Sequence, residues 1–345
     1  MNSETFLCYF DAESSAVFLL VFCGVKNSKK EKEIRKMEIL LQIVLLVVGF
    51  VMLVKGADWF VDGSAGIAAK FGIPQLVIGL TIVAMGTSAP EAAVSISAAL
   101  KGSAEITIGN IVGSNIMNVL VILGLSAAIT PLMVAKSTVK VELPFMIGIT
   151  LLLLALGYNG VIGAGFAAIL VVFFIAYLTY LFIMAKKNKE EQEEAKDLSV
   201  VKALILTVVG LVFIVWGSNV TVNAATAIAK IVGLSERFIG LTIVALGTSL
   251  PELFTSVSAA RKGNADIAIG NIVGSNIFNI LFVVGLSGLV VPVPFAEAFR
   301  FDTIVAALSA VLLWLCCFRN GKLQRWSGIL MLLCYVAYFA VIWFK

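Results

Sequence analysis

Long runs of apolar residues, separated by short polar segments, occupy almost the whole chain after residue 37. A helix needs about 20 apolar residues to cross the hydrocarbon core of a bilayer. The runs are continuously apolar rather than alternating, which favours helices over the strands of a membrane barrel. The pattern therefore predicts an all-α polytopic membrane protein with ten transmembrane helices. The expected spans are residues 38–56 (where the helix has room to continue towards 69), 74–100, 105–130, 140–157, 161–185, 199–230, 236–261, 266–291, 301–318 and 326–344.

One charged stretch, KKNKEEQEEAKD at 186–197, divides the ten expected spans into five and five. Its composition is that of a solvated linker, and it is too short to form a regulatory domain. We therefore expect a first five-helix repeat at 37–185, a linker at 186–198 and a second five-helix repeat at 199–345.

The first 36 residues do not fit this plan. Their one apolar run, Ala16–Val25, is too short to span a bilayer. A signal peptide carries its positive charge before the apolar region, whereas here the basic residues follow it. We interpret 1–36 as an N-terminal extension, and two explanations remain open: translation starts at Met37, or the segment is a peripheral tail.

Residues 79–126 and 240–287 are two copies of one sequence, which agree at 33 of 48 positions at an offset of 161. Each copy places a glutamate, Glu91 or Glu252, inside an apolar run, where an ionisable side chain is costly and usually marks a functional pathway. Corresponding residues are separated by five spans, an odd number, so the copies are expected to cross the membrane in opposite directions. Inverted-topology repeats are typical of secondary transporters, which bind substrate near the midplane between the repeats.

The amino-acid composition indicates a membrane protein and argues against enzyme and transition-metal sites. The chain is 60% hydrophobic and 13% charged, which is typical of a polytopic membrane protein. It has no histidine, and this removes the commonest proton shuttle and the commonest transition-metal ligand. The five cysteines show no zinc-site spacing, and no Ser/His or HExxH arrangement exists. We therefore expect no enzyme activity and no cofactor.

Lysine and arginine in the short loops predict the orientation of the chain in the membrane. The side expected to face the cytoplasm carries Lys136, Lys140, Lys186, Lys187, Lys189, Arg261, Lys262, Arg319, Lys322 and Arg325. The opposite side carries Lys101, Lys230, Arg237, Arg300 and Lys345. This distribution places the linker in the cytoplasm and both ends of the ten-helix core outside; the basic residues at 26–36 do not follow it.

Each copy of the repeat also contains a helix breaker. In GTSAPE, Pro90 has no N–H to offer the carbonyl of Gly86, and in GTSLPE, Pro251 has none for Gly247. Carbonyls near 86–87 and 247–248 are therefore expected to be freed from the helix. Free backbone at membrane depth persists only inside protein or beside a cavity. Freed carbonyls next to a carboxylate predict an oxygen-rich cation site.

The second part of each copy, GNIVGSNIMN or GNIVGSNIFN, adds a serine and an asparagine four residues apart, hence on one helix face. Glycines at 109, 113, 270 and 274 are expected to let helices approach closely. The combined oxygen ligands, without sulfur or imidazole, favour Na⁺, Ca²⁺ or Mg²⁺ over zinc or copper. A flexible cage suits Ca²⁺ and Na⁺ better than Mg²⁺, which requires strict octahedral geometry.

These paired motifs resemble the two α-repeats of the sodium/calcium exchangers, in the calcium:cation antiporter superfamily. The resemblance covers residues 37–345, and prokaryotic members of that family are inner-membrane proteins with a short central loop. It implies that the glutamates are the ligands shared by calcium and sodium, and that the threonines contribute mainly carbonyls. The implied cation ligands are Glu91, Glu252, Thr87, Ser88, Thr248, Ser249, Ser114, Ser275, Asn118 and Asn279, with the carbonyls of Ala84 and Ala245.

Two departures from relatives bear on the coupling ion. Several relatives, including the potassium-dependent branch, carry aspartate where this chain has Asn279. The cation/proton branch carries a glutamate where Gly113 and Gly274 stand here. Both departures weaken a potassium-coupled or proton-coupled interpretation.

The sequence thus predicts an antiporter in the bacterial inner membrane that exchanges Na⁺ for Ca²⁺ by alternating access and extrudes Ca²⁺. A cation/proton antiporter or another divalent-cation antiporter is the alternative, and a cation channel is a rival from another class. The expected partners are membrane lipid and the two transported ions, with no nucleic acid and no obligate protein partner.

Overall fold

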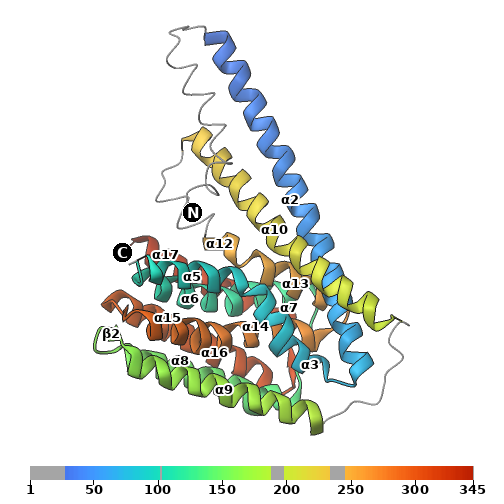
Figure 1. Ribbon diagram of the computed structural model, residues 1–345, viewed down its shortest axis with the longest axis vertical. Coiled ribbons are helices and arrows are strands. Elements are labelled where there is room, and N and C mark those ends of the chain that lie inside the picture. The colour runs from blue at the N-terminus through green and yellow to red at the C-terminus, as the bar shows by residue number, and fades with distance from the viewer. Residues whose placement is uncertain (1–27, 102, 188–197, 234–244, 345) are drawn as a thin grey trace, which may run out of the picture.

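The computed structural model describes residues 28–101, 103–187, 198–233 and 245–344 (Figure 1). These residues are almost entirely helical, which confirms the all-α membrane class. The first half contains α2 (Ser28–Phe71), α3 (Gln75–Ile78), η1 (Gly79–Val83), α4 (Ala84–Thr87), α5 (Ala89–Leu100), α6 (Glu105–Met117), η2 (Asn118–Leu123), α7 (Gly124–Ile129), η3 (Thr138–Glu142), α8 (Leu143–Gly157) and α9 (Ala164–Lys187). The second half contains α10 (Val200–Val232), α12 (Ala245–Thr248), α13 (Leu250–Arg261), α14 (Ala265–Phe278), η5 (Asn279–Val284), α15 (Gly285–Val290), α16 (Glu297–Phe318) and α17 (Arg325–Phe344).

Eight helices of the described residues are long and apolar enough to cross a membrane, or nine if the bent pair 75–87 and 89–100 is one span. The expected span at 236–261 falls partly on residues 234–244, which lie outside the described residues. The predicted total of ten therefore stays a prediction.

The first helix is long. α2 runs unbroken from Ser28 to Phe71, so it continues past 56 into the region towards 69 where the expected span had room, and it also includes residues 28–36 of the expected N-terminal extension. Residues 1–27 of the expected extension lie outside the described residues. The apolar run ends early because Asp58 and Asp62 interrupt it, and these side chains find partners on another helix.

Two continuous helical segments form the centre of the molecule. Nearly all residues in the most apolar part of the span at 265–290, and most of those in the span at 106–129, are buried. By contrast, α2, α9, α10 and α17 expose much of their apolar surface, including Val172, Trp216 and Leu333. Apolar side chains on the outside match a hydrocarbon solvent, so the polar groups inside the central helices are shielded from both water and lipid.

Helices α2 and α10 pack closely and lie side by side along one flank of the molecule (Figure 1). Gly56 of α2 faces Gly210 of α10, and a Cβ added to Gly210 would lie 2.5 Å from the backbone nitrogen of Phe60. Gly49 lies against Gly217, so positions rise along α2 as they fall along α10 and the pair is antiparallel. Small residues at such a crossing allow the two backbones to touch.

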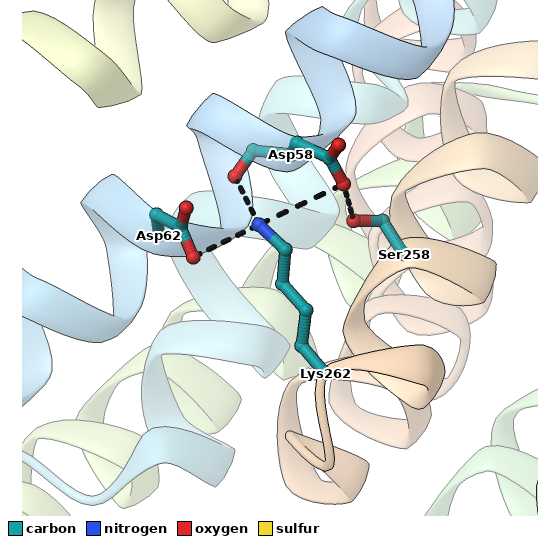
Figure 2. Close-up of polar contacts among 4 residues, drawn as sticks. All are labelled: Asp58, Asp62, Ser258 and Lys262. Atoms are coloured by element: carbon teal, nitrogen blue, oxygen red, sulfur yellow. Dashed lines mark hydrogen bonds and ion pairs between the residues drawn. The ribbon is translucent and has the colours of Figure 1, made fainter.

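A polar clasp, formed by Asp58, Asp62, Ser258 and Lys262, joins α2 to the end of α13 (Figure 2). The Lys262 ammonium lies 2.9 Å from Asp62 Oδ1 and 3.7 Å from Asp58 Oδ1, and it donates to the backbone carbonyl of Asp58 at 2.7 Å. Ser258 Oγ donates to Asp58 Oδ1 at 2.6 Å. The clasp accounts for two acidic residues in a helix that otherwise contacts lipid and apolar helices.

Two short antiparallel ladders link the halves. β1 (Leu132–Met133) pairs with β4 (Lys322–Leu323), and β2 (Val161–Ile162) pairs with β3 (Val293–Pro294). The repeat offset carries β1 onto β3 and β2 onto β4. Shifting the pair Leu132–Leu323 by this offset gives the other observed pair, Val293–Ile162, so the two ladders exchange equivalent strands.

Candidate functional site

The first predicted helix break is present. α4 ends at Thr87, Ser88 has non-helical angles (φ −83°, ψ 5°), and α5 begins at Ala89 with Pro90 in its first turn. The segments on either side are bent by 49°. Glu91 therefore lies in the first turn of α5, where free backbone N–H groups favour a negative charge. Its side chain is only 1% exposed.

The second break has the same local geometry. α12 ends at Thr248, Ser249 has φ −90° and ψ 2°, and α13 begins at Leu250 with Pro251 in its first turn. Glu252 occupies the first turn of α13 and is fully buried. Ser249 is buried and Thr248 is partly buried, whereas residues 234–244, which precede this break, lie outside the described residues.

The two breaks meet inside the protein. Ser88 Oγ, at the first break, donates a 2.7 Å hydrogen bond to Glu252 Oε1, at the second. The Glu91 and Glu252 carboxylates lie close enough to interact electrostatically. Two buried like charges repel strongly in a medium of low polarity, so this arrangement favours a cation between or beside them.

The central helices supply the other predicted side chains. Ser114 on α6 and Ser275 on α14 are buried, and Ser275 Oγ donates to the Ala84 carbonyl at 3.3 Å. Asn118 is the first residue of η2 and Asn279 is the first residue of η5. Both are π-helical segments, which occur often at functional sites because they displace side chains and backbone from the regular α-helical register.

Close helix approach is confirmed for one of the two predicted glycine pairs. A Cβ at Gly270 would lie 3.0 Å from Gly79, and one at Gly274 would lie 2.7 Å from the Leu80 carbonyl oxygen. These contacts press α14 against η1 and the first break. The corresponding neighbours of Gly109 and Gly113 would be residues 240 and 241, outside the described residues.

The prediction of freed carbonyls needs a correction at Gly247. Pro251 has no N–H to donate to the Gly247 carbonyl oxygen, but Ser218 Oγ on α10 donates to that oxygen at 2.7 Å. The Gly247 carbonyl therefore has a hydrogen-bond partner on a neighbouring helix instead of its own. The Ala84 carbonyl oxygen also has protein donors: the Ser88 N–H at 3.0 Å and Ser275 Oγ at 3.3 Å.

Sequence reasoning missed a pair of supporting asparagines, Asn110 and Asn271. Asn110 Nδ2 donates to Ser95 Oγ at 2.9 Å and to the Glu91 carbonyl at 3.4 Å. Asn271 Nδ2 makes the equivalent bonds to Ser256 and Glu252 at the same distances. Their signal was available, because each follows the glycine of the GN pair and the two correspond at the repeat offset.

Asn271 also connects the two halves. Its Oδ1 accepts a 2.9 Å hydrogen bond from Thr87 Oγ1, on the opposite side of the site. A second missed pair, Asn115 and Asn276, makes reciprocal bonds: each amide nitrogen donates to the other residue's backbone carbonyl, at 3.2 and 3.1 Å. Buried amide networks of this kind are rigid because each member is held by several partners.

Several acceptor oxygens in this region have no hydrogen-bond donor among the described residues. They are Glu91 Oε2, Glu252 Oε2, Asn118 Oδ1 and Asn279 Oδ1. A buried oxygen without a partner is destabilising, and a bound cation would remove that penalty. The described residues contain no cluster of three or more histidine, cysteine, aspartate or glutamate side chains. The site therefore offers two carboxylates with neutral oxygens, the ligand chemistry of Na⁺ and Ca²⁺.

Comparison with known proteins gives consistent matches. The family described as sodium/calcium exchanger protein matches residues 41–183 and 202–344, two segments that correspond at the repeat offset. The inner membrane protein YrbG of Escherichia coli K12 is 34% identical over 319 residues, covering 88% of this chain and 97% of that protein. The sodium/calcium exchanger MaX1 of Methanosarcina acetivorans is 34% identical over 348 residues, covering 89% and 99%. A solved structure of the sodium-calcium exchanger NCX_Mj has a TM-score of 0.78 and 34% identity, covering 87% of this chain and 98% of that one.

Proposed function

Because this chain belongs to the sodium/calcium exchanger family, whose members are multi-span membrane transporters rather than enzymes, we propose that it exchanges Na⁺ for Ca²⁺ by alternating access. One observation carries this proposal: two buried glutamates from two broken helices meet, and their second carboxylate oxygens have no donor among the described residues. A bound cation would neutralise both carboxylates and give these oxygens a partner.

The proposed ligands follow the repeat. Glu91 and Glu252 bind both ions, and Asn118 and Asn279 contribute their amide oxygens. Thr87, Ser88, Thr248, Ser249, Ser114 and Ser275 contribute hydroxyl or backbone oxygens. The carbonyls of Ala84 and Ala245 complete the set, and Ala84 is the least available of these because it already accepts protein hydrogen bonds.

Charge arithmetic accounts for exchange. Two carboxylates neutralise one Ca²⁺, whereas three Na⁺, the count usual in this family, would leave one positive charge. Ions that need the same glutamates cannot occupy the site together, so their binding alternates. A cycle that moves one net charge is driven by the membrane potential with about 2.3 kcal/mol per 100 mV.

We propose ten spans arranged as two inverted five-helix repeats. Three observations support this topology. Helices α2 and α10, which correspond at the repeat offset, pack antiparallel. The two strand ladders exchange equivalent strands. The family match divides into two segments at the same offset. An in-plane two-fold axis between the halves is the geometry that places a transporter's site at the midplane.

The distribution of basic residues supports a bacterial inner-membrane orientation with residues 186–198 in the cytoplasm and both ends of the core outside. In that orientation the inward Na⁺ gradient and the membrane potential both favour Ca²⁺ extrusion.

Charge-neutral substitutions test the site. Glu91→Gln and Glu252→Gln are each expected to abolish Ca²⁺ uptake into Na⁺-loaded proteoliposomes. The matched control is Glu142→Gln, a buried carboxyl that accepts a hydrogen bond from the Tyr180 hydroxyl and lies outside the proposed ligand set. Normal uptake by either site variant, with normal insertion, would show that the ligand assignment is wrong.

A further inference from the structure

Four asparagines form a crossed network between the two halves. Asn115 Nδ2 donates to the backbone carbonyl of Asn276 at 3.2 Å, and Asn276 Nδ2 donates to that of Asn115 at 3.1 Å. Asn118 Nδ2 donates to Asn276 Oδ1 at 3.0 Å, and Asn279 Nδ2 donates to Asn115 Oδ1 at 3.2 Å. All four side chains are buried, between 0% and 4% exposed.

The backbone carbonyls determine which way each amide points. A carbonyl oxygen only accepts, so the end of Asn115 that faces the Asn276 carbonyl must be its NH₂ group. The other end of Asn115 is then Oδ1, which also only accepts. Asn279 must therefore present its own NH₂ group to Asn115. By the same argument, Asn276 must present its NH₂ group to the Asn115 carbonyl. Asn118 must then present its NH₂ group to Asn276 Oδ1.

The remaining end of each outer amide is its oxygen. Asn118 Oδ1 and Asn279 Oδ1 have no donor among the described residues, although both side chains are buried. Their nitrogens are occupied by the network and their oxygens are left to accept. For a cation this is the required polarity, since an NH₂ group in the same place would repel it.

We propose that Asn115 and Asn276 are positioning residues that turn the amide oxygens of Asn279 and Asn118 towards the transported cation. Each acts on the ligand of the opposite half: Asn115 on Asn279, and Asn276 on Asn118. The inference rests on the proposed exchange function and deepens it. It also explains a selectivity feature of this chain, namely that its site keeps two carboxylates.

An aspartate at 279 would not fit the same network. When ionised it has no donor for Asn115 Oδ1, so two acceptor oxygens would face each other, and only its protonated, uncharged form could donate there. Rotating the Asn115 amide would relieve that contact, but its oxygen would then face the Asn276 carbonyl. The network is therefore matched to an amide at both 118 and 279, and it holds the charge of the site at that of Glu91 and Glu252.

The test uses the full-length protein in proteoliposomes and measures the KM for Ca²⁺ and the maximal rate of Na⁺-driven uptake. Asn115→Leu and Asn276→Leu remove the orienting oxygens and keep the branched shape and the number of side-chain heavy atoms. Each is expected to raise the KM for Ca²⁺ about tenfold, the equivalent of one buried hydrogen bond, with a smaller effect on the maximal rate. An unchanged KM would overturn the proposal.

The crossed pairing separates positioning from a general structural role. In an Asn279→Ala background, Asn115→Leu should cause no further rise in KM, whereas in an Asn118→Ala background it should cause its full rise. Asn276→Leu should behave in the opposite way. Equal effects in both backgrounds would show that the asparagines only hold the helices together, and would overturn the proposal.

Two further controls keep the result interpretable. If the leucine variants do not elute as the wild type does, Asn115→Ser and Asn276→Ser remove the same amide oxygens with a smaller apolar change, and the crossed pattern is expected again. Absence of Na⁺-driven Ca²⁺ uptake by the wild type would overturn the proposed function, whereas wild-type uptake without the crossed pattern would overturn this inference alone.

Discussion

The hydroxyl of Ser88 donates a 2.7 Å hydrogen bond to the carboxylate of Glu252, so the helix break of each half is joined to that of the other. Both residues are buried, at 0% exposure. The bond holds one glutamate oxygen in place and leaves the second oxygen available. The proposed binding site is therefore shared between the halves, and a movement of one half relative to the other would change it.

Loss of this bond should weaken Ca²⁺ binding. Ser88→Ala is expected to raise the KM for Ca²⁺ about tenfold or more, because hydrogen bonds to a charged group contribute about 1.5–3 kcal/mol. Ser309→Ala is the matched control, since Ser309 is a buried serine on α16 that donates to the Ala306 carbonyl. Equal changes in KM for the two variants would show that Ser88 does not hold the site glutamate.

Bound Ca²⁺ should stabilise the folded protein. A ligand at 100 times its Kd raises the free energy of unfolding by about 2.7 kcal/mol, so the melting temperature in detergent should rise with Ca²⁺. Added Na⁺ should reduce that rise by competing for the same glutamates. Glu252→Gln should lose the rise, and a variant that kept it would show that Ca²⁺ binds elsewhere.

The contact between α2 and α10 should not accept a side chain at its closest point. Gly210→Ala would place a Cβ 2.5 Å from the Phe60 nitrogen, and such overpacking costs about 1–3 kcal/mol. At Gly148, among the described residues, no heavy atom lies within 4 Å of an added Cβ, so Gly148→Ala should be neutral or slightly stabilising. Thermal unfolding in detergent measures both, and equal melting temperatures would contradict the packing.

The ion pairs of the polar clasp at Lys262 should contribute a small part of the free energy of unfolding, and the equivalent position in the first half should contribute less. Lys262→Met should lower the free energy of unfolding by at most about 1 kcal/mol, because the ion pairs are partly exposed. The matched control is Lys101→Met, since Lys101 is the equivalent residue in the first half. On α10, the residues equivalent to Asp58 and Asp62 are Asn219 and Asn223, so there are no aspartates at these positions for Lys101 to pair with. A larger loss for Lys101→Met would contradict this account.

Local sequence features predicted the helix breaks well. Pro90 and Pro251 end hydrogen bonding whatever surrounds them, and the structure places Glu91 and Glu252 in the first turn after each break. The apolar runs likewise predicted most span boundaries to within a few residues. These features depend on residues that are near each other in the chain, so no knowledge of the packing was needed.

Features that depend on distant partners were not predictable in this way. The ion pairs of Asp58 and Asp62 on α2 depend on Lys262, which is far along the chain from both aspartates. The hydrogen bonds between Asn115 and Asn276 exist only because the two halves meet, and no local signal in the sequence marked the π-helical starts at Asn118 and Asn279. The Gly247 carbonyl oxygen accepts a hydrogen bond from Ser218 on α10, a partner that lies outside the local motif.

The most direct test of the central claim is radioactive Ca²⁺ uptake into proteoliposomes, with Na⁺, K⁺ and proton gradients imposed separately. We predict that an outward Na⁺ gradient drives uptake, that an interior-negative potential opposes the Na⁺ efflux that accompanies it, and that K⁺ and proton gradients alone drive none. Uptake that ignores the Na⁺ gradient, or that follows the proton gradient instead, would contradict the account.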